Sequence, residues 1–102
     1  MSINSNKSNA INIISDNINI FQNFDKVYIF GSILNPDKHS NDIDLLLLYR
    51  DYSDYINENI IAITDYLETY TSHIIDITAL SFNEEKEVSF IEKLNNRYLC
   101  IK

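Results

Sequence analysis

The chain has 102 residues, of which 45% are hydrophobic, and it contains one glycine, one proline and one cysteine. The length fits a single domain with a modest core, and the composition is that of a globular protein. No apolar segment approaches the ~20 residues that cross a bilayer, and the polar N-terminus is unlike a signal peptide, so we expect no membrane association. The lone Cys100 excludes an internal disulfide and a cysteine-based zinc site, which indicates a reducing, cytoplasmic setting.

The chain is strongly acidic, with 15 Asp and Glu against 8 Lys and Arg and a formal net charge of −7. Proteins hold nucleic acids mainly through Lys and Arg contacts to phosphate, and here the only arginines are Arg50 and Arg97. Nucleic acid is therefore not expected to be the main partner.

The first half of the chain predicts a helix and a strand. Residues 1–9 are polar and are expected to be a flexible N-terminus, which leaves residues 10–102 as one domain. Apolar side chains spaced by three and four predict a helix from Ile11 to about Phe24. A short buried strand over Lys26–Phe30 leads directly into Gly31-Ser32, and a polar loop follows to Asn41.

The second half of the chain alternates strands and helices. The expected elements are a strand over Asp42–Tyr49, a helix over residues 54–72 that Ser53 or Asp54 caps, a strand over Ile74–Leu80, a helix from Asn83 and Glu84 to about Asn95, and a short strand over Tyr98–Ile101. The apolar side of the longer helix, expected to face the core, consists of Ile56, Ile60, Ile63, Leu67 and Tyr70. His39 and His73 are expected to be solvated loop residues.

The lengths of these elements predict the sheet topology. Eight residues of strand at ~3.3 Å each travel ~26 Å, and 19 residues of helix at ~1.5 Å each travel ~28 Å back. The third strand should therefore run parallel to the second, while the short loop after Gly31 favours an antiparallel first strand. The predicted fold class is α+β, with a small mixed sheet and flanking helices.

This topology brings the chemically distinctive residues to one edge of the sheet. Gly31-Ser32 lies at the end of the first strand, and Asp42 and Asp44 share one face at the start of the second. Asp76, the third residue of its strand, should neighbour Asp44 in the parallel pair.

Three carboxylates in one place repel each other unless protons or cations offset their charge. Two unit charges ~4 Å apart cost about 4 kcal/mol at an effective dielectric of ~20. A site of oxygen ligands without His or Cys suits Mg²⁺ or Mn²⁺ rather than zinc. A Gly-Ser turn beside it allows phosphates to approach the backbone amides and offers a hydroxyl donor.

At these residues the sequence resembles the polymerase-β-like nucleotidyltransferase superfamily, and most of all its minimal MNT-type members. The match consists of an apolar strand, Gly31-Ser32, a spacer, Asp42-Ile43-Asp44-Leu45 and the later strand that carries Asp76. The resemblance implies that Asp42 and Asp44 bind two Mg²⁺ ions, that Asp76 completes the second metal site and acts with them in catalysis, and that Gly31 and Ser32 hold the phosphates of ATP.

In bacteria, MNT-type proteins are commonly encoded beside a HEPN-domain ribonuclease toxin. The resemblance therefore implies an antitoxin that transfers AMP from ATP to a tyrosine of that toxin and associates with it. This chain has Ile33-Leu34-Asn35 where the family usually carries an Arg and a Gly, and Lys38 is a candidate substitute for the missing charge. The alternative is a binding module of the same fold that neutralises its partner by occlusion. Nucleotide preference, acceptor residue and oligomeric state are left open by the sequence.

Overall fold

A computed structural model describes residues 5–102, with side chains from residue 7 onward. The strands are β1 (Lys26–Phe30), β2 (Asp42–Tyr49), β3 (Ile74–Ser81) and β4 (Tyr98–Cys100). The helices are α1 (Ser5–Asp16), α2 (Asp54–Thr71), α3 (Phe82–Val88) and α4 (Phe90–Lys93), with two 3-10 turns, η1 (Ile18–Phe21) and η2 (Ser32–Leu34). No helix within the described residues combines the length and the apolar character that crossing a membrane requires.

The four strands form one mixed sheet in the order β3-β2-β1-β4. As predicted, β1 is antiparallel to β2, and β3 is parallel to β2. β4 adds to the other edge of β1 in the antiparallel sense. The α+β class with a small mixed sheet is therefore confirmed.

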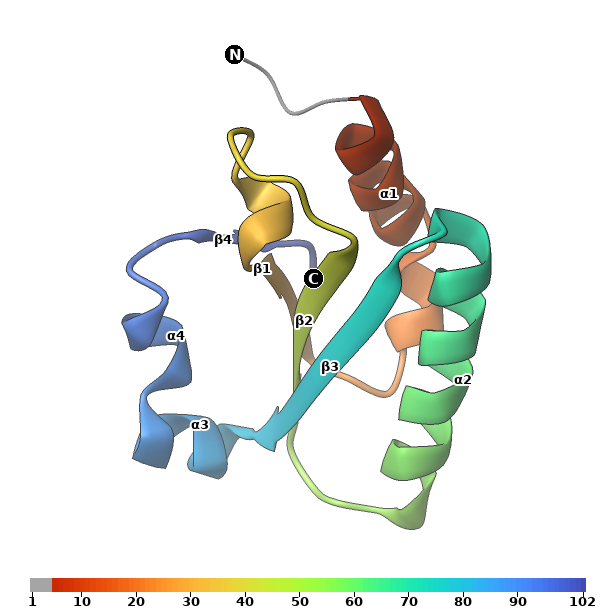
Figure 1. Ribbon diagram of the computed structural model, residues 1–102. Coiled ribbons are helices and arrows are strands. Elements are labelled where there is room, and N and C mark those ends of the chain that lie inside the picture. Colours follow the sequence, from red (N-terminus) through yellow and green to blue (C-terminus); the bar gives the residue numbers. More distant parts are fainter. Residues whose placement is uncertain (1–4) are drawn as a thin grey trace.

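The sheet separates two groups of helices, with α1 and α2 on one side and α3 and α4 on the other (Figure 1). The main core lies between the sheet and the first group, where Leu45 and Leu47 of β2 are fully buried. Side chains alternate along a strand, so Leu46 and Leu48 face the opposite side, and they are buried there too. The run of leucines is thus covered on both faces, as its sequence predicted.

The N-terminal part of the prediction is wrong in two respects. Residues 5–9, expected to be flexible, form the first turns of α1, while residues 1–4 lie outside the described part of the chain. The helix expected from Ile11 to Phe24 ends at Asp16, because Asn17 turns its side chain back onto the backbone. Its amide nitrogen donates to the carbonyl of Ile13 at 2.7 Å, and its amide oxygen accepts from the Tyr66 hydroxyl at 2.9 Å.

The predicted apolar side of α2 is confirmed except at its last member. Ile56, Ile63 and Leu67 are buried and Ile60 packs against the core, but Tyr70 is 59% exposed. Its ring lies instead against that of Tyr66, with 4.6 Å between the centroids. Ser53 occupies the N-cap position of α2 without a side-chain capping bond.

The single helix predicted after β3 is divided into α3 and α4 at Ser89, which has a left-handed backbone with φ 52°. Two local interactions account for the division. The carboxylate of Glu85 accepts from the backbone amide of Ile91 at 3.1 Å, which satisfies an otherwise unpaired donor of α4. The ring of Phe90 meets that of Phe30 edge to face, so α4 is held against β1.

The single glycine ends β1 in a conformation that other residues rarely adopt. Gly31 has φ 88° and ψ −164°, and a Cβ placed on it would lie 2.1 Å from Oδ2 of Asp44. The turn therefore requires glycine for its backbone angles and for the room it leaves beside Asp44.

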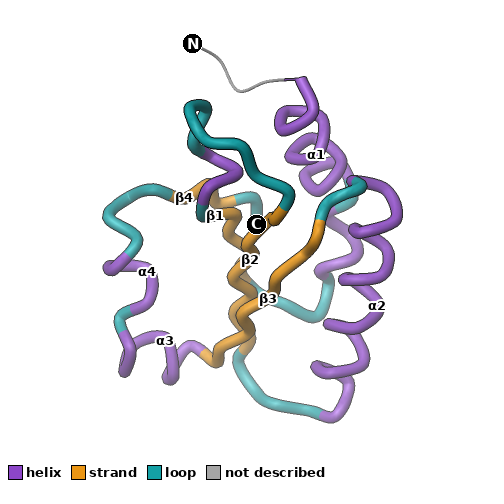
Figure 2. The backbone as a smooth tube through the Cα atoms, in the orientation of Figure 1, coloured by secondary structure: helices purple, strands orange, loops and turns teal. Residues whose placement is uncertain are grey.

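A long loop connects η2 to β2 (Figure 2). It contains no glycine, because the one glycine of the chain, Gly31, precedes η2. The side chain of Lys7 in α1 is buried beneath this loop region, with only 2% of its surface exposed, and it holds the loop through hydrogen bonds. Its ammonium group donates to the carbonyl oxygens of Ser32 at 3.4 Å, of Asn35 at 2.8 Å and of Lys38. One buried cation thus fixes three points of the loop.

Replacing Gly31 by Ala is expected to destabilise the fold. The backbone alone should cost about 1–3 kcal/mol, and the added Cβ must also displace the Asp44 carboxylate. Urea unfolding measures the loss. The control is Ser72→Gly, because Ser72 has φ 58° and should gain about 1 kcal/mol from glycine. If Gly31→Ala is as stable as the unsubstituted chain, the turn does not require glycine at this position.

Replacing Lys7 by Met keeps the aliphatic stem but removes the donor from three carbonyl groups. We expect a loss of about 1.5–3 kcal/mol in the free energy of unfolding and faster hydrogen exchange in residues 32–38. Lys26→Met is the matched control, because Lys26 is exposed and should change stability by no more than about 0.5 kcal/mol. Equal effects of the two substitutions would show that the Lys7 bonds do not support the loop.

Candidate active site

Asp44 and Asp76 lie side by side on one face of the sheet. In the parallel register of β2 and β3, Asp44 pairs with Asp76, and in the antiparallel register of β1 it pairs with Phe30. Adjacent strands are about 4.8 Å apart, and residues in register point to the same face. The predicted proximity of Asp44 and Asp76 is therefore present. Asp42 lies two residues before Asp44 on the same face and pairs with Ile74.

The electrostatics of Asp44 reflect this crowding. Burial raises the pKa of its carboxyl group above the ordinary value, and the nearby charges of Asp76 and Asp42 raise it further, in that order. Asp44 is half-buried, whereas Asp42 and Asp76 are exposed. One sheltered carboxylate is thus flanked by two acids that solvent can reach.

Ser32 is connected to the start of β2 through Ser40. The Ser32 hydroxyl donates to the Ser40 hydroxyl at 2.8 Å, and the Ser40 hydroxyl donates to the Asp42 carbonyl at 2.9 Å. The Ser40 oxygen also accepts from the Asp42 amide at 3.3 Å. Gly31 lies against Asp44 and Ser32 is tied to Asp42, so the turn and the acids form one arrangement.

Sequence reasoning missed two residues of this arrangement. Ser40 had a usable signal, because a serine two residues before a strand commonly bonds to the backbone of its own turn. Lys7 had none, since its loop partners are 25 to 31 residues away along the chain. The charge at this loop is thus supplied in part from α1, outside the segment that carries the motif.

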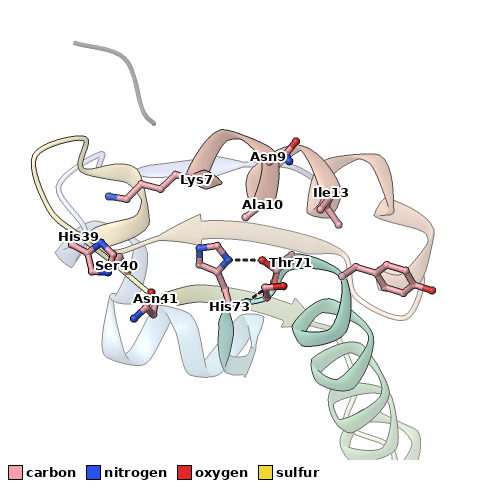
Figure 3. Close-up of a pocket in the computed structure, with 11 residues that line it drawn as sticks. Lys7, Asn9, Ala10, Ile13, His39, Ser40, Asn41, Thr71 and His73 are labelled. Atoms are coloured by element: carbon pink, nitrogen blue, oxygen red, sulfur yellow. Dashed lines mark hydrogen bonds between the residues drawn. The ribbon is translucent and has the colours of Figure 1, made fainter. Parts of the chain in front are cut away.

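A cavity of about 480 Å³ lies beside this edge of the sheet, between α1, the start of β2 and the turn after α2. Figure 3 shows Lys7 extending toward the segment of His39 and Ser40, with His73 between that segment and Thr71. His39 is exposed as expected, but His73 is half-buried, and its Nδ1 lies 2.7 Å from the Thr71 carbonyl. None of the proposed acids lines this cavity.

A second cavity, of about 760 Å³, begins at Gly31 and Ser32 and extends toward the segment between α4 and β4. Its volume lies within the range of small-molecule sites, about 300–1,000 Å³. It opens directly from the turn that the sequence singles out.

The donor set near Asp44 suits a hard cation. The acids supply only oxygen, and no histidine or cysteine lies among the residues paired with them. In the described part of the chain, no three His, Cys, Asp or Glu side chains already converge as a metal site. The backbone register places the acids as neighbours, and side-chain rotation would have to direct them to a shared ion.

Comparison with known proteins agrees with this arrangement. Residues 8–101 match the model of the family described as polymerase beta, nucleotidyltransferase. No curated protein sequence matches the chain at a significant level.

Solved structures share the fold at low sequence identity. A protein from Sulfolobus solfataricus, provisionally assigned as a nucleotidyltransferase, is 18% identical with a TM-score of 0.53, and the match covers 93% of this chain and 81% of that one. A chain of the toxin–antitoxin complex MntA-HpeT, in which two aspartates separated by one residue are replaced by glutamate, is 18% identical with a TM-score of 0.55. A chain of a toxin–antitoxin structure with AMP-PNP is 21% identical with a TM-score of 0.55. Each of these two matches covers 94% of this chain and 72% of the other.

The family model spans nearly the whole chain and coincides with the sheet that carries Gly31, Asp44 and Asp76. The chain therefore belongs to the polymerase beta nucleotidyltransferase family.

Proposed function

We propose that this protein is an MNT-type antitoxin that transfers AMP from ATP to a tyrosine hydroxyl of a HEPN-type ribonuclease toxin. The observation that carries the proposal is the arrangement of Gly31, Asp44 and Asp76, with the first two in close approach and the last two in register. Two of the structures that share the fold come from toxin–antitoxin complexes, one of them described with AMP-PNP. The Asp-x-Asp spacing of Asp42 and Asp44 also equals that of the two aspartates replaced in the other complex.

The acids are proposed to hold two divalent cations, Mg²⁺ or Mn²⁺. Asp42 and Asp44 would bind both ions and Asp76 would complete the second site. When bound, such ions lower the pKa of an attacking hydroxyl group and neutralise pyrophosphate as it leaves. Asp44 is the central ligand in this proposal because it is half-buried between the other two. The absence of a side chain at Gly31 leaves room for its carboxylate.

Gly31 and Ser32 are proposed to position the phosphates of ATP. In the reaction, a bond from the tyrosine oxygen to the α-phosphorus forms while the bond from that phosphorus to the bridging oxygen of pyrophosphate breaks. Ser32, whose hydroxyl bonds to Ser40, is one of the residues that line the larger cavity, where a phosphate group would be held. A polypeptide acceptor suits a domain of this size, because such a partner brings its own binding surface. A cytoplasmic location is part of the same proposal.

A second candidate function is neutralisation of the partner by occlusion, without catalysis. It is favoured by the sequence Ile33-Leu34-Asn35, which lacks the Arg and Gly usual in the family. The two candidate functions differ in one requirement: AMP transfer needs the carboxylates of Asp42, Asp44 and Asp76 to neutralise the toxin, whereas occlusion does not.

The transfer reaction can be tested with the protein encoded beside this gene. Incubation of the pair with ATP and Mg²⁺ is expected to add one or more AMP units to the neighbour, detected by mass spectrometry. Asp42→Asn combined with Asp44→Asn should abolish the mass gain and the protection from toxicity. Asp51→Asn combined with Asp65→Asn is the matched control, because both acids are exposed and neither lies on a strand of the sheet. The contrary result would be that the two proteins bind each other without any gain in mass and that the Asp42→Asn, Asp44→Asn variant still protects from toxicity. That result would favour occlusion.

Metal binding can be tested without a partner. The protein should bind Mn²⁺ in the presence of ATP, as measured by electron paramagnetic resonance, and Asp44→Asn should weaken this binding at least about 10-fold, because second-shell losses alone reach that size. Asp51→Asn should leave it unchanged. If Asp44→Asn binds Mn²⁺ as well as the unsubstituted protein does, the cations are not held at this edge of the sheet.

A further inference from the structure

The larger cavity has a charge opposite to that of the molecule. Its lining includes Lys38, Lys93 and Arg97, which are three of the chain's eight basic residues, and no Asp or Glu. In a chain with 15 acidic residues, a cavity of about 760 Å³ without a lining carboxylate is a marked separation of charge. Such a surface attracts anions and concentrates them.

These basic side chains are available to a ligand. Lys38, Lys93 and Arg97 are all exposed, and none of them forms an ion pair within the part of the chain that the structure describes. Two distant segments contribute them. Lys38 belongs to the loop that Lys7 anchors, and the other two flank the turn between α4 and β4.

The turn that carries Lys93 and Arg97 has a defined backbone. Asn95 and Asn96 both have a left-handed conformation, with φ 53° and 65°, and the Arg97 amide donates to the Leu94 carbonyl at 3.0 Å. β4 then pairs with β1, which places this turn next to the end of β1 and therefore next to Gly31 (Figure 1). The amide side chains of Asn95 and Asn96 also line the cavity and add neutral hydrogen-bond donors.

The cavity includes the proposed phosphate site, because Gly31 and Ser32 are among the residues that line it. We propose that Lys38, Lys93 and Arg97 form a binding wall for the β- and γ-phosphates of a nucleoside triphosphate. This inference rests on the proposed function and identifies which residues replace the positive charge that Ile33-Leu34-Asn35 does not provide. The triphosphate carries the largest negative charge of the substrate, and the planar guanidinium group of Arg97 suits bidentate phosphate binding.

The proposed binding wall can be tested by comparing how its substitutions change the affinity for nucleotides that carry three phosphates or one. Affinities for ATP and for AMP, both with Mg²⁺, are measured by isothermal titration calorimetry on the full chain. Arg97→Gln should weaken ATP binding at least about 10-fold, as a lost charge-assisted contact does, while AMP binding changes less than about 3-fold. Lys93→Gln should act in the same direction, and inorganic triphosphate should compete with ATP less well for either variant than for the unsubstituted chain.

The chain offers a matched control, because its only other arginine, Arg50, is exposed at the opposite end of β2. Arg50→Gln should leave both affinities unchanged, and equal urea midpoints for all variants show that the fold is intact. If Arg97→Gln and Lys93→Gln both bind ATP as well as the unsubstituted protein does, these side chains do not bind the β- and γ-phosphates. The proposed function is unaffected by that result. Equal weakening of ATP and AMP would also overturn the assignment to the β- and γ-phosphates. Failure of the unsubstituted protein to bind ATP at all would overturn both proposals.

Discussion

The parallel pairing of β2 with β3 sets Asp44 beside Asp76, and the rest of the site depends on this placement of two acidic residues on neighbouring strands. A slip of β2 by one residue is disfavoured, because it would turn Asp44 toward the main core and remove Ile43, which is fully buried there. The hydrophobic core therefore holds the two acids together even though their repulsion opposes it. Burial and the neighbouring acids raise the pKa of Asp44, as expected for a carboxyl group that the sheet holds close to other carboxyl groups.

The loop between β1 and β2 is held by polar interactions rather than by glycine turns. Gly31 provides the sharp end of β1, Ser40 joins Ser32 to Asp42, and Lys7 binds three carbonyl groups of the loop. Burial of a lysine is costly unless its ammonium group is satisfied, and the carbonyl oxygens provide that compensation. The first helix is thus a structural part of the site, although it carries no residue of the family motif.

Features that depend on local pattern and length could be predicted from the sequence. The bounds of β1 and β2, the parallel β3 and the proximity of Asp44 to Asp76 follow from alternation of side chains and from the equal lengths of strand and helix. Features that depend on distant partners could not be predicted. Helix α1 ends where Asn17 meets Tyr66, and the cavity gathers Lys38 with Lys93 and Arg97 only because β4 pairs with β1. The proposed roles of the acids rest on chemistry that the sequence suggested and that the fold permits.

The central claim is that Asp42, Asp44 and Asp76 share divalent cations with a nucleotide. Anomalous diffraction from crystals grown with Mn²⁺ and a non-hydrolysable ATP analogue tests it most directly. The account predicts Mn²⁺ peaks within about 2.0–2.3 Å of carboxylate oxygens of these three residues, with the nucleotide phosphates beside Gly31. Peaks elsewhere on the protein, with the analogue bound and these acids without a cation, would contradict it.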